Sequence, residues 1–289
     1  MFLKPISFIF FFLFITRVSA QSDVGVISGG AGFVATGFFG SNFYSPQIAP
    51  VILIPSGDKW LIEARGTVGE LIFQENGNGG PFHSATFTSV DFLQLDYIAN
   101  SHLTITAGYF LTPFNIYNER LSPIWIKNFQ DPPIIGAIGT QTSGSSAGGM
   151  LGGVAISRQS WELSDVAYFS AASTVNKFNS GRAAGGRVGL FFPRTRLEVG
   201  VSYQRLLQDT HANASGVYLS WLPTQVHFDI KAEYAHSPNG QGYWLEGAYR
   251  MSSLGGKNSL IGRAQPLARV QQFYKGTPSS TSGLPSVDT

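Results

Sequence analysis

Apolar and polar residues alternate with a period of two in several segments of the chain. The clearest is 225–234 (QVHFDIKAEY), where five apolar residues from Val226 to Tyr234 alternate with five polar ones. Because successive side chains of a β-strand point to opposite faces, this pattern predicts a strand with one apolar and one polar face. The same alternation occurs over 59–68, 103–111 and 196–204, with an exception at Leu61.

Weaker strand patterns occur throughout the chain, and short polar turns separate many of them. They cover 24–38, 85–98, 150–157, 161–171, 183–192, 214–222, 241–251 and 266–274. The alternation in 85–98 changes phase near Asp91, which predicts a β-bulge. Helical periodicity is confined to short turns within 112–135. We therefore expect an all-β, antiparallel fold with about a dozen strands of roughly ten residues.

Two all-β architectures fit this pattern. A soluble sandwich would point its apolar faces inward, whereas a transmembrane barrel would point them at lipid and enclose a polar lumen. Three features favour the barrel. The strands have the length that a tilted strand needs to cross a bilayer, and aromatic residues lie near strand ends. The polar faces are rich in glycine and carry charges of both signs. The sandwich stays open, because alternation does not tell which face meets water. The candidates for lining a lumen are Glu63, Arg65, Arg196, Glu198, Asp229, Lys231 and Glu233.

The first twenty residues have the layout of a secretory signal peptide. Lys4 precedes ten consecutive apolar residues, 6–15, and Val18-Ser19-Ala20 offers a cleavage site before Gln21. A membrane anchor is the alternative, but a spanning helix needs about twice that apolar length. Removing residues 1–20 leaves 17 basic and 17 acidic residues. A neutral mature chain argues against a nucleic-acid partner, since phosphate binding requires a surplus of cations.

A connection of 38 residues, 112–149, separates two of the predicted strands. Its first part contains enough apolar residues to pack against the protein, whereas 139–149 is rich in Gly, Ser and Thr and is expected to be mobile. Connections of this length are usually functional or disordered. We expect the loop to fold into the barrel and narrow it; an external cap or a subunit contact is the alternative. The constriction candidates are Asn118, Glu119, Arg120, Lys127 and Asp131.

The segment 108–121 (GYFLTPFNIYNERL) resembles the G-x-F-x-x-P-F-G motif of bacterial outer-membrane porins of the phosphate-selective type. The resemblance implies a Gram-negative outer-membrane barrel, usually of sixteen strands and commonly trimeric, which passes ions and small solutes by diffusion without a cofactor. Two features depart from the family. The neutral charge argues against carrying over phosphate selectivity. Asn115 replaces the last glycine of the motif, although Asn tolerates a left-handed backbone better than most residues.

Residues 21–275 are expected to form the barrel, and 276–289 has the composition of a flexible tail or a truncated external loop. About a dozen strands followed by such a tail suggest a barrel truncated before its last hairpins. A smaller closed barrel with a trailing tail is the alternative.

The sequence offers little for catalysis or metal binding. The chain has no cysteine, which excludes thiol chemistry and thiolate ligands. His227, Asp229 and Glu233 share one strand face, but a solvated wall is a far more common role for such residues than a ligand set. We therefore expect an outer-membrane porin without metal, cofactor or enzymatic activity. The alternatives are a barrel with a plugged lumen that serves as a structural or adhesive protein, or a lipid-modifying enzyme that uses His227.

Overall fold

The computed structural model describes residues 24–38, 41–74, 80–121, 133, 144–208, 211–251 and 259–276. Over these residues thirteen antiparallel strands form one sheet, in which each strand pairs with its neighbours in sequence order. The strands are β1 (Val26–Phe38), β2 (Ser41–Ser56), β3 (Trp60–Gln74), β4 (Phe82–Asn100), β5 (Leu103–Leu111), β6 (Ser145–Ser157), β7 (Glu162–Ser170), β8 (Ala183–Phe192), β9 (Leu197–Leu206), β10 (Asn213–Trp221), β11 (Phe228–Ser237), β12 (Gly240–Tyr249) and β13 (Leu267–Lys275). The expectation of an all-β, antiparallel fold is confirmed.

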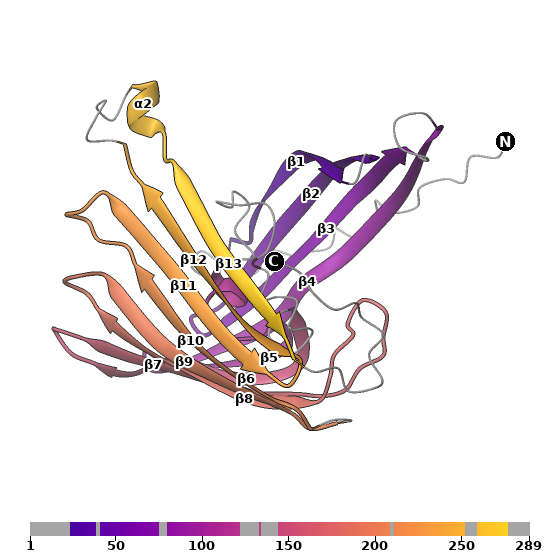
Figure 1. Ribbon diagram of the computed structural model, residues 1–289. Coiled ribbons are helices and arrows are strands. Elements are labelled where there is room, and N and C mark those ends of the chain that lie inside the picture. Colours follow the sequence, from indigo (N-terminus) through magenta and orange to yellow (C-terminus); the bar gives the residue numbers. More distant parts are fainter. Residues whose placement is uncertain are drawn as a thin grey trace.

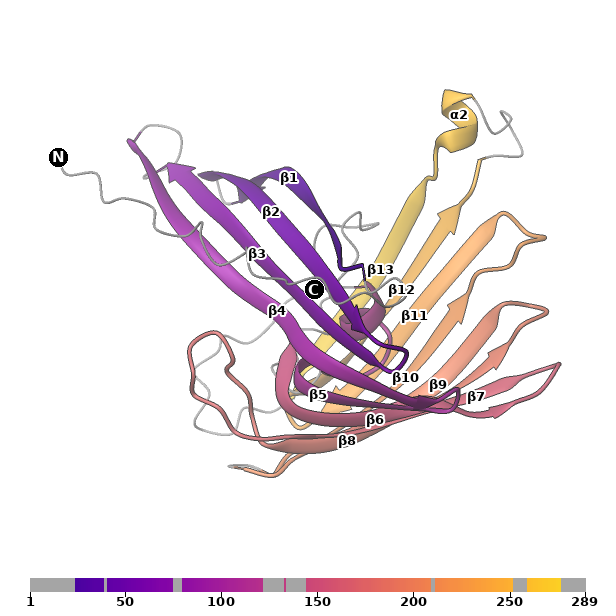
Figure 2. The ribbon, with the colours of Figure 1, turned by 180° about the vertical axis from the view of Figure 1, so that it is seen from behind.

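The sheet curls into a deep trough (Figure 1 and, from behind, Figure 2). Strands β1–β4 form one wall, β10–β13 form the other, and β5–β9 form the floor between them. Within the described ranges no ladder joins β1 to β13. Among the described residues, two short helices accompany the sheet, the one-turn π-helix η2 (Tyr117–Leu121) and α2 (Leu260–Arg263). No helix in the described part of the chain is long and apolar enough to cross a bilayer.

Strand β2 was absent from the predicted strands because it contains three prolines, Pro46, Pro50 and Pro55. Proline has no N–H, and proline within a run normally argues against a strand. The ladder between β2 and β3 has gaps at Pro46 and Pro50, whereas Pro55 pairs with Leu61 near the end of the strand. The ladder between β1 and β2 is continuous over Pro46 and Pro50.

Several predicted boundaries need correction. Strand β6 begins at Ser145, so the long connection spans 112–144, and residues 145–149, expected to be mobile, are paired with β5. Their glycines concealed the strand pattern, yet Gly148 is required because a Cβ there would collide with the carbonyl oxygen of Phe169. Residues 225–227, predicted to begin a strand, are bends that precede β11. The expected bulge at Asp91 is confirmed, because the register between β3 and β4 passes over this residue.

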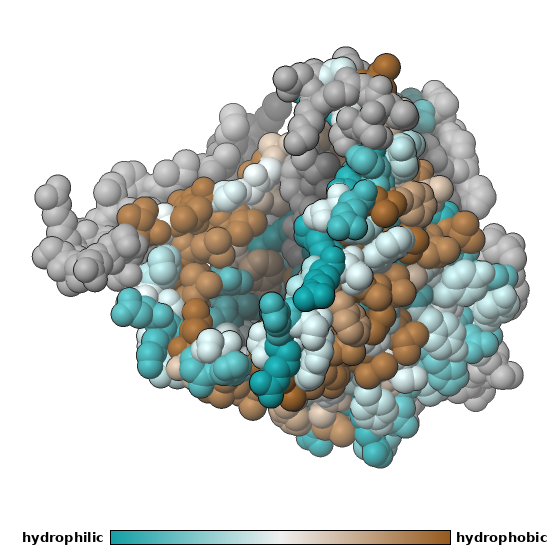
Figure 3. Space-filling view, turned by 90° about the vertical axis from the view of Figure 1, so that its left-hand side faces the viewer, coloured by the Kyte–Doolittle hydropathy of each residue, from teal (hydrophilic) through white to brown (hydrophobic). Residues whose placement is uncertain are grey.

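The two faces of the sheet differ in polarity and in burial. The outer, convex face carries large apolar side chains in contact with solvent, and Figure 3 shows broad hydrophobic areas on the side turned to the viewer. Among the exposed ones are Leu95, Leu103, Val201, Val217, Leu245 and Val270. The face that lines the trough carries buried polar residues, including Asp96, Arg187, Ser202, Gln204, Glu233 and Glu246. This polarity is opposite to that of a soluble sandwich, which buries its apolar faces.

The N-terminal segment 1–20 and the tail 277–289 lie outside the described residues. The described strands, from Val26 to Lys275, form a single sheet, and Gly276, directly after β13, is the last residue that the structure describes.

Candidate functional site

The segment Thr112–Leu121, which follows β5, lies inside the trough (Figure 1). We name it the docked segment, because it contacts the polar face of β8–β12. It leaves β5 at Thr112, whose N–H donates to Gly144 O at 3.0 Å and whose hydroxyl lies 2.9 Å from the Ser146 hydroxyl. The segment ends in the single turn of η2.

Glu233 on β11 holds the backbone of the docked segment. Its Oε1 accepts the N–H groups of Ile116 and Tyr117 at 2.7 and 2.6 Å, and its Oε2 accepts the indole N–H of Trp244 at 2.9 Å. Glu233 is 4% exposed. A carboxylate that accepts three donors is well satisfied despite its burial, and such charge-assisted bonds are stronger than neutral ones. Glu233 was expected to line a lumen, and the structure places it under the docked segment.

Asn115 makes the sharp turn that brings the docked segment onto the sheet. Its φ of 52° is left-handed, as the sequence led us to expect of this position. Its N–H donates to Ser202 Oγ at 2.9 Å, and its carbonyl accepts from Arg187 at 2.7 Å. The side chain sits against Gly216 of β10, where a Cβ would lie 2.6 Å from Asn115 Oδ1 and 2.9 Å from the ring of Phe114. Gly216 therefore provides the space for the segment.

An apolar cluster anchors the same segment. Phe114 packs with Ala214, Ala235 and Trp244, all of them at most 3% exposed. The partly buried side chains around this cluster are Tyr117, Leu121 and Phe273. Tyr117 meets Trp244 edge to face, with ring centroids 6.2 Å apart. The apolar residues of the segment thus pack against the sheet.

Two ion pairs connect η2 to the trough floor. Glu119 contacts Arg187 of β8 at 2.5 Å, and Arg120 contacts both oxygens of Glu198 of β9 at 2.6 and 2.8 Å. Tyr218 donates its hydroxyl to the same Glu198 at 2.9 Å. Burial lowers the pKa of Arg120, but its hydrogen bond to Glu198 and the charge of Glu198 more than offset this, so the net pKa is raised and Arg120 stays charged.

Asn118 has a structural role that the sequence did not suggest. Its amide N–H₂ donates to Thr112 O at 2.8 Å and Gly144 O at 2.7 Å, and its Oδ1 accepts from Gly144 N at 2.9 Å. These bonds join the two ends of the long loop. Asn118 is 4% exposed, and its side chain clamps the two ends of the loop together. Lys127 and Asp131 lie outside the described residues.

The other expected lining residues lie along both walls, mostly in ion pairs. Arg65 meets Asp91 at 3.1 Å, and Glu63 accepts from Gln94 at 3.4 Å. Asp229 meets Arg250 at 3.1 Å, and Lys231 lies 3.9 Å from Glu246. Arg196 is different: it lies in the exposed turn before β9, with φ of 52°, and not on a strand.

Sequence reasoning missed several charged residues of the trough. They are Asp91, Asp96, Arg187, Glu246, Arg250 and Arg269. The phase of β12 and β13 could have revealed Glu246 and Arg269, which alternate with apolar residues and form an ion pair at 2.9 Å. Arg187 follows two glycines in an otherwise apolar segment and gave no clear pattern. Acidic and basic side chains both occur on the trough face and most of them are paired with one another, so no single-sign ring forms among the described side chains.

Metal ligation has no support in the part of the chain that the structure describes, where no group of three His, Asp or Glu side chains could hold an ion. His227, the histidine considered for catalysis, lies before β11 with its ring 6.4 Å from that of Tyr249.

Comparison with known proteins finds likeness only among solved structures. No family model matches the chain, and no curated protein matches it. Among solved structures it is similar to the crystal structure of Pseudomonas aeruginosa OccK7 (OpdD), with a TM-score of 0.38 and 11% identity over 86% of this chain and 81% of that one.

Proposed function

We propose that this protein is a bacterial outer-membrane porin through which ions and small hydrophilic solutes cross by passive diffusion. The observation that supports this most directly is the polarity of the sheet: exposed apolar side chains on the convex face and paired charges in the trough. An apolar outer band and a polar interior are what a bilayer selects in a barrel. The resemblance of 108–121 to a porin motif adds the outer-membrane location and a trimeric assembly to the proposal.

The docked segment is the proposed constriction. It carries Arg120, whose side chain is 38% exposed and therefore reaches the open part of the trough beside Glu198. Because Glu119 and Arg120 are each paired with a floor residue of opposite charge, the constriction has little net charge. We therefore propose weak ion selectivity and no preference for phosphate, since selectivity needs an excess of one sign.

Single-channel recording in planar bilayers tests this function, using protein extracted from its native membrane. We expect discrete, long-lived conductance steps. In a salt gradient, Arg120→Gln exposes the charge of Glu198 and shifts the reversal potential towards cation preference, whereas Glu198→Gln shifts it towards anions. A unit charge about 5 Å from the ion path is worth about 0.8 kcal/mol in water, and screening at 0.1 M salt reduces this to about 0.5 kcal/mol. Because the sign is opposite for cations and anions, the permeability ratio should change by about fivefold.

Arg194→Gln is the matched control, because it removes the same charge from the exposed turn between β8 and β9. It should leave the reversal potential unchanged. If Arg120→Gln and Glu198→Gln behave like this control while the channel conducts, the docked segment is not the constriction. Absence of conductance from correctly inserted protein would contradict the porin proposal itself.

A second candidate is a barrel whose lumen the long loop fills, with a structural or adhesive role. The tight packing of Phe114 against Trp244 and the three bonds to Glu233 favour it. A silent wild-type protein that begins to conduct when residues 113–120 are replaced by glycine and serine would support this alternative. We propose no catalytic role in either case.

A further inference from the structure

Three buried side-chain oxygens between the docked segment and the floor of the trough have no hydrogen-bonding partner among the described residues. They are the Tyr168 hydroxyl on β7, Gln204 Oε1 on β9 and Asn115 Oδ1 in the docked segment; their residues are 5%, 3% and 1% exposed. Buried polar groups are normally bonded, because an unpaired one has lost its hydrogen bonds to bulk water without replacement. Three such oxygens at one interface therefore point to a ligand.

Tyr168 and Gln204 lie on either side of Gly185 of β8. The ladders pair Tyr168 with Gly185 and Gly185 with Gln204, so the three residues form one row across the floor. The ring of Tyr168 lies over the glycine, because a Cβ at Gly185 would be 2.9 Å from Tyr168 Oη. The hydroxyl therefore reaches over β8 towards Gln204, yet the two side chains form no hydrogen bond with each other.

The docked segment covers the other end of this row. Gln204 is paired with Ala214 of β10, and Phe114 packs against Ala214. Asn115 comes next in the segment, and its N–H donates to the hydroxyl of Ser202, which lies two residues from Gln204 on the same face of β9. The three unpaired oxygens thus belong to one patch, which the segment and the floor form together.

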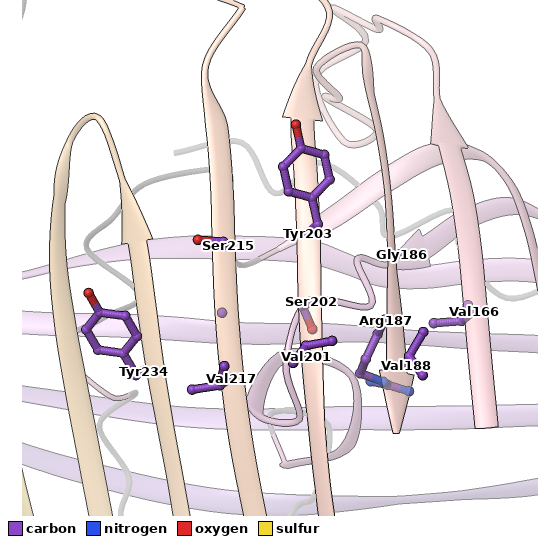
Figure 4. Close-up of a pocket in the computed structure, with 11 residues that line it drawn as sticks. Val166, Gly186, Arg187, Val188, Val201, Ser202, Tyr203, Ser215, Val217 and Tyr234 are labelled. Atoms are coloured by element: carbon purple, nitrogen blue, oxygen red, sulfur yellow. The ribbon is translucent and has the colours of Figure 1, made fainter. Parts of the chain in front are cut away.

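The chemistry of the patch selects water. Gln204 Oε1 and Asn115 Oδ1 only accept hydrogen bonds, so an anion would find the Tyr168 hydroxyl as its single donor there. Arg187, two residues along β8 from Gly185 (Figure 4), already donates to the backbone of the docked segment. Hard metal cations are usually held by carboxylates, and no group of three His, Asp or Glu side chains among the described residues could hold one. A water molecule donates two hydrogen bonds and accepts others, which suits two acceptors and a hydroxyl.

We propose that ordered water occupies the patch between the docked segment and the floor of the trough. One water accepts from the Tyr168 hydroxyl and donates to Gln204 Oε1, and water in the same patch donates to Asn115 Oδ1. Because the segment and the floor both contribute groups, the site exists only in the docked form, and water bound there stabilises that form. The inference goes beyond the proposed function, since it rests on the contacts of the docked segment and not on conduction.

A crystal structure of the full-length protein, at a resolution that shows ordered water, tests the site directly. We expect a density peak about 2.6–3.0 Å from both Tyr168 Oη and Gln204 Oε1, the usual length of a hydrogen bond between oxygens. A patch without density would overturn the proposal. So would a peak about 2.3–2.4 Å from these oxygens, because that distance indicates a metal cation.

Removing the Tyr168 hydroxyl has opposite effects on a hydrated and a dry patch. Trypsin cleavage after Arg120 follows the undocked population when opening and closing are fast relative to cleavage. In a hydrated patch, Tyr168→Phe removes one hydrogen bond of the water, and we expect cleavage about fivefold faster than in the wild type. In a dry patch the same substitution removes a buried unpaired group and slows cleavage. Slower or unchanged cleavage would therefore contradict the proposal.

Gln204→Met tests whether the two side chains share one water. Alone it should accelerate cleavage to a similar extent, and combining it with Tyr168→Phe should add little, because the same water is already lost. Independent effects, about 25-fold in the double variant, would overturn the shared site. Circular dichroism verifies that each variant is folded.

Tyr203→Phe is the matched control, since it removes a hydroxyl from the outer face of the same strand. The Tyr203 hydroxyl donates to Asn213 at 2.8 Å, away from the docked segment. The control should be cleaved at the wild-type rate. Acceleration as great as in Tyr168→Phe would show that the effect does not come from the patch, and the proposal would fail.

Discussion

Replacing Glu233 by alanine should release the docked segment from the trough wall. The substitution removes the acceptor of three N–H groups, those of Ile116, Tyr117 and the Trp244 indole. Hydrogen bonds to a charged group contribute about 1.5–3 kcal/mol each. If water reached none of the three donors, the free energy of docking would fall by about 5–9 kcal/mol. Because water can reach part of the trough, we expect the free energy of docking to fall by about 3 kcal/mol. That corresponds to about a 100-fold larger undocked population.

Cleavage by trypsin after Arg120 measures this population. When opening and closing are fast relative to cleavage, the cleavage rate follows the equilibrium between docked and undocked forms. We therefore expect Glu233→Ala to be cut at Arg120 about 100-fold faster than the wild type, by mass spectrometry of the fragments. Glu233→Gln should be intermediate, because a carboxamide can accept from the two backbone amides only by turning its N–H₂ towards the N–H of Trp244.

Asp96→Asn is the control for a buried carboxylate elsewhere in the trough. Asp96 is 6% exposed and accepts from Thr106 at 2.5 Å and from Gln94 at 3.1 Å, on the opposite wall. It should leave the cleavage rate at Arg120 unchanged. The reasoning fails if Glu233→Ala is cut within twofold of the wild-type rate while both proteins remain folded by circular dichroism.

Three further outcomes follow from the same contacts. Gly216→Val should also accelerate cleavage at Arg120, because its side chain occupies the space of the docked segment, at a cost of about 1–3 kcal/mol; unchanged cleavage would mean that the neighbouring side chains make room. Asn118→Ala should lower the midpoint of thermal unfolding, since three hydrogen bonds between the loop ends are lost; a wild-type midpoint would contradict the clamp. On the outer face of β4, Leu95→Lys should destabilise the protein in lipid vesicles by up to about 2–4 kcal/mol, as measured by urea titration. The neighbouring Gln94→Lys, which faces Glu63 in the trough, should not destabilise it. Equal effects of the two substitutions would contradict a lipid-facing outer surface.

The strands were largely predictable because each one lies at the boundary between two environments. A strand with one exposed apolar face and one polar face alternates, so β5 was predicted with the observed bounds, and the bulge at Asp91 was visible as a change of phase. The alternation of apolar and polar residues does not predict a strand where the backbone conformation, and not the side-chain environment, decides the residue type. Prolines concealed β2, and the glycines at the start of β6 left no side chains to alternate.

The candidate site was predictable only in part, because its geometry depends on partners distant in sequence. The apolar residues of 112–121 predicted that the segment packs against something, but nothing local pointed to Glu233, more than one hundred residues away. Within η2, the neighbours Asn118, Glu119 and Arg120 have different partners: the loop ends, β8 and β9. A single helical turn has no periodicity from which these directions could be read, so residue type alone gave all three the same predicted role.

The docked segment is held by two kinds of contact that respond differently to water. The bonds to Glu233, Arg187 and Glu198 join groups that a hydrated trough could solvate, so each contributes only the net difference between protein and water partners. The packing of Phe114 against Trp244 has no such substitute, because exposing an aromatic side chain to water costs about 1.5–3 kcal/mol. The polar contacts therefore fix where the segment lies, and the aromatic cluster adds a comparable amount of free energy that does not depend on which charges face the trough. A change of the exposed charges of Arg120 or Glu198 should for this reason leave the segment docked, whereas loss of Glu233 should not.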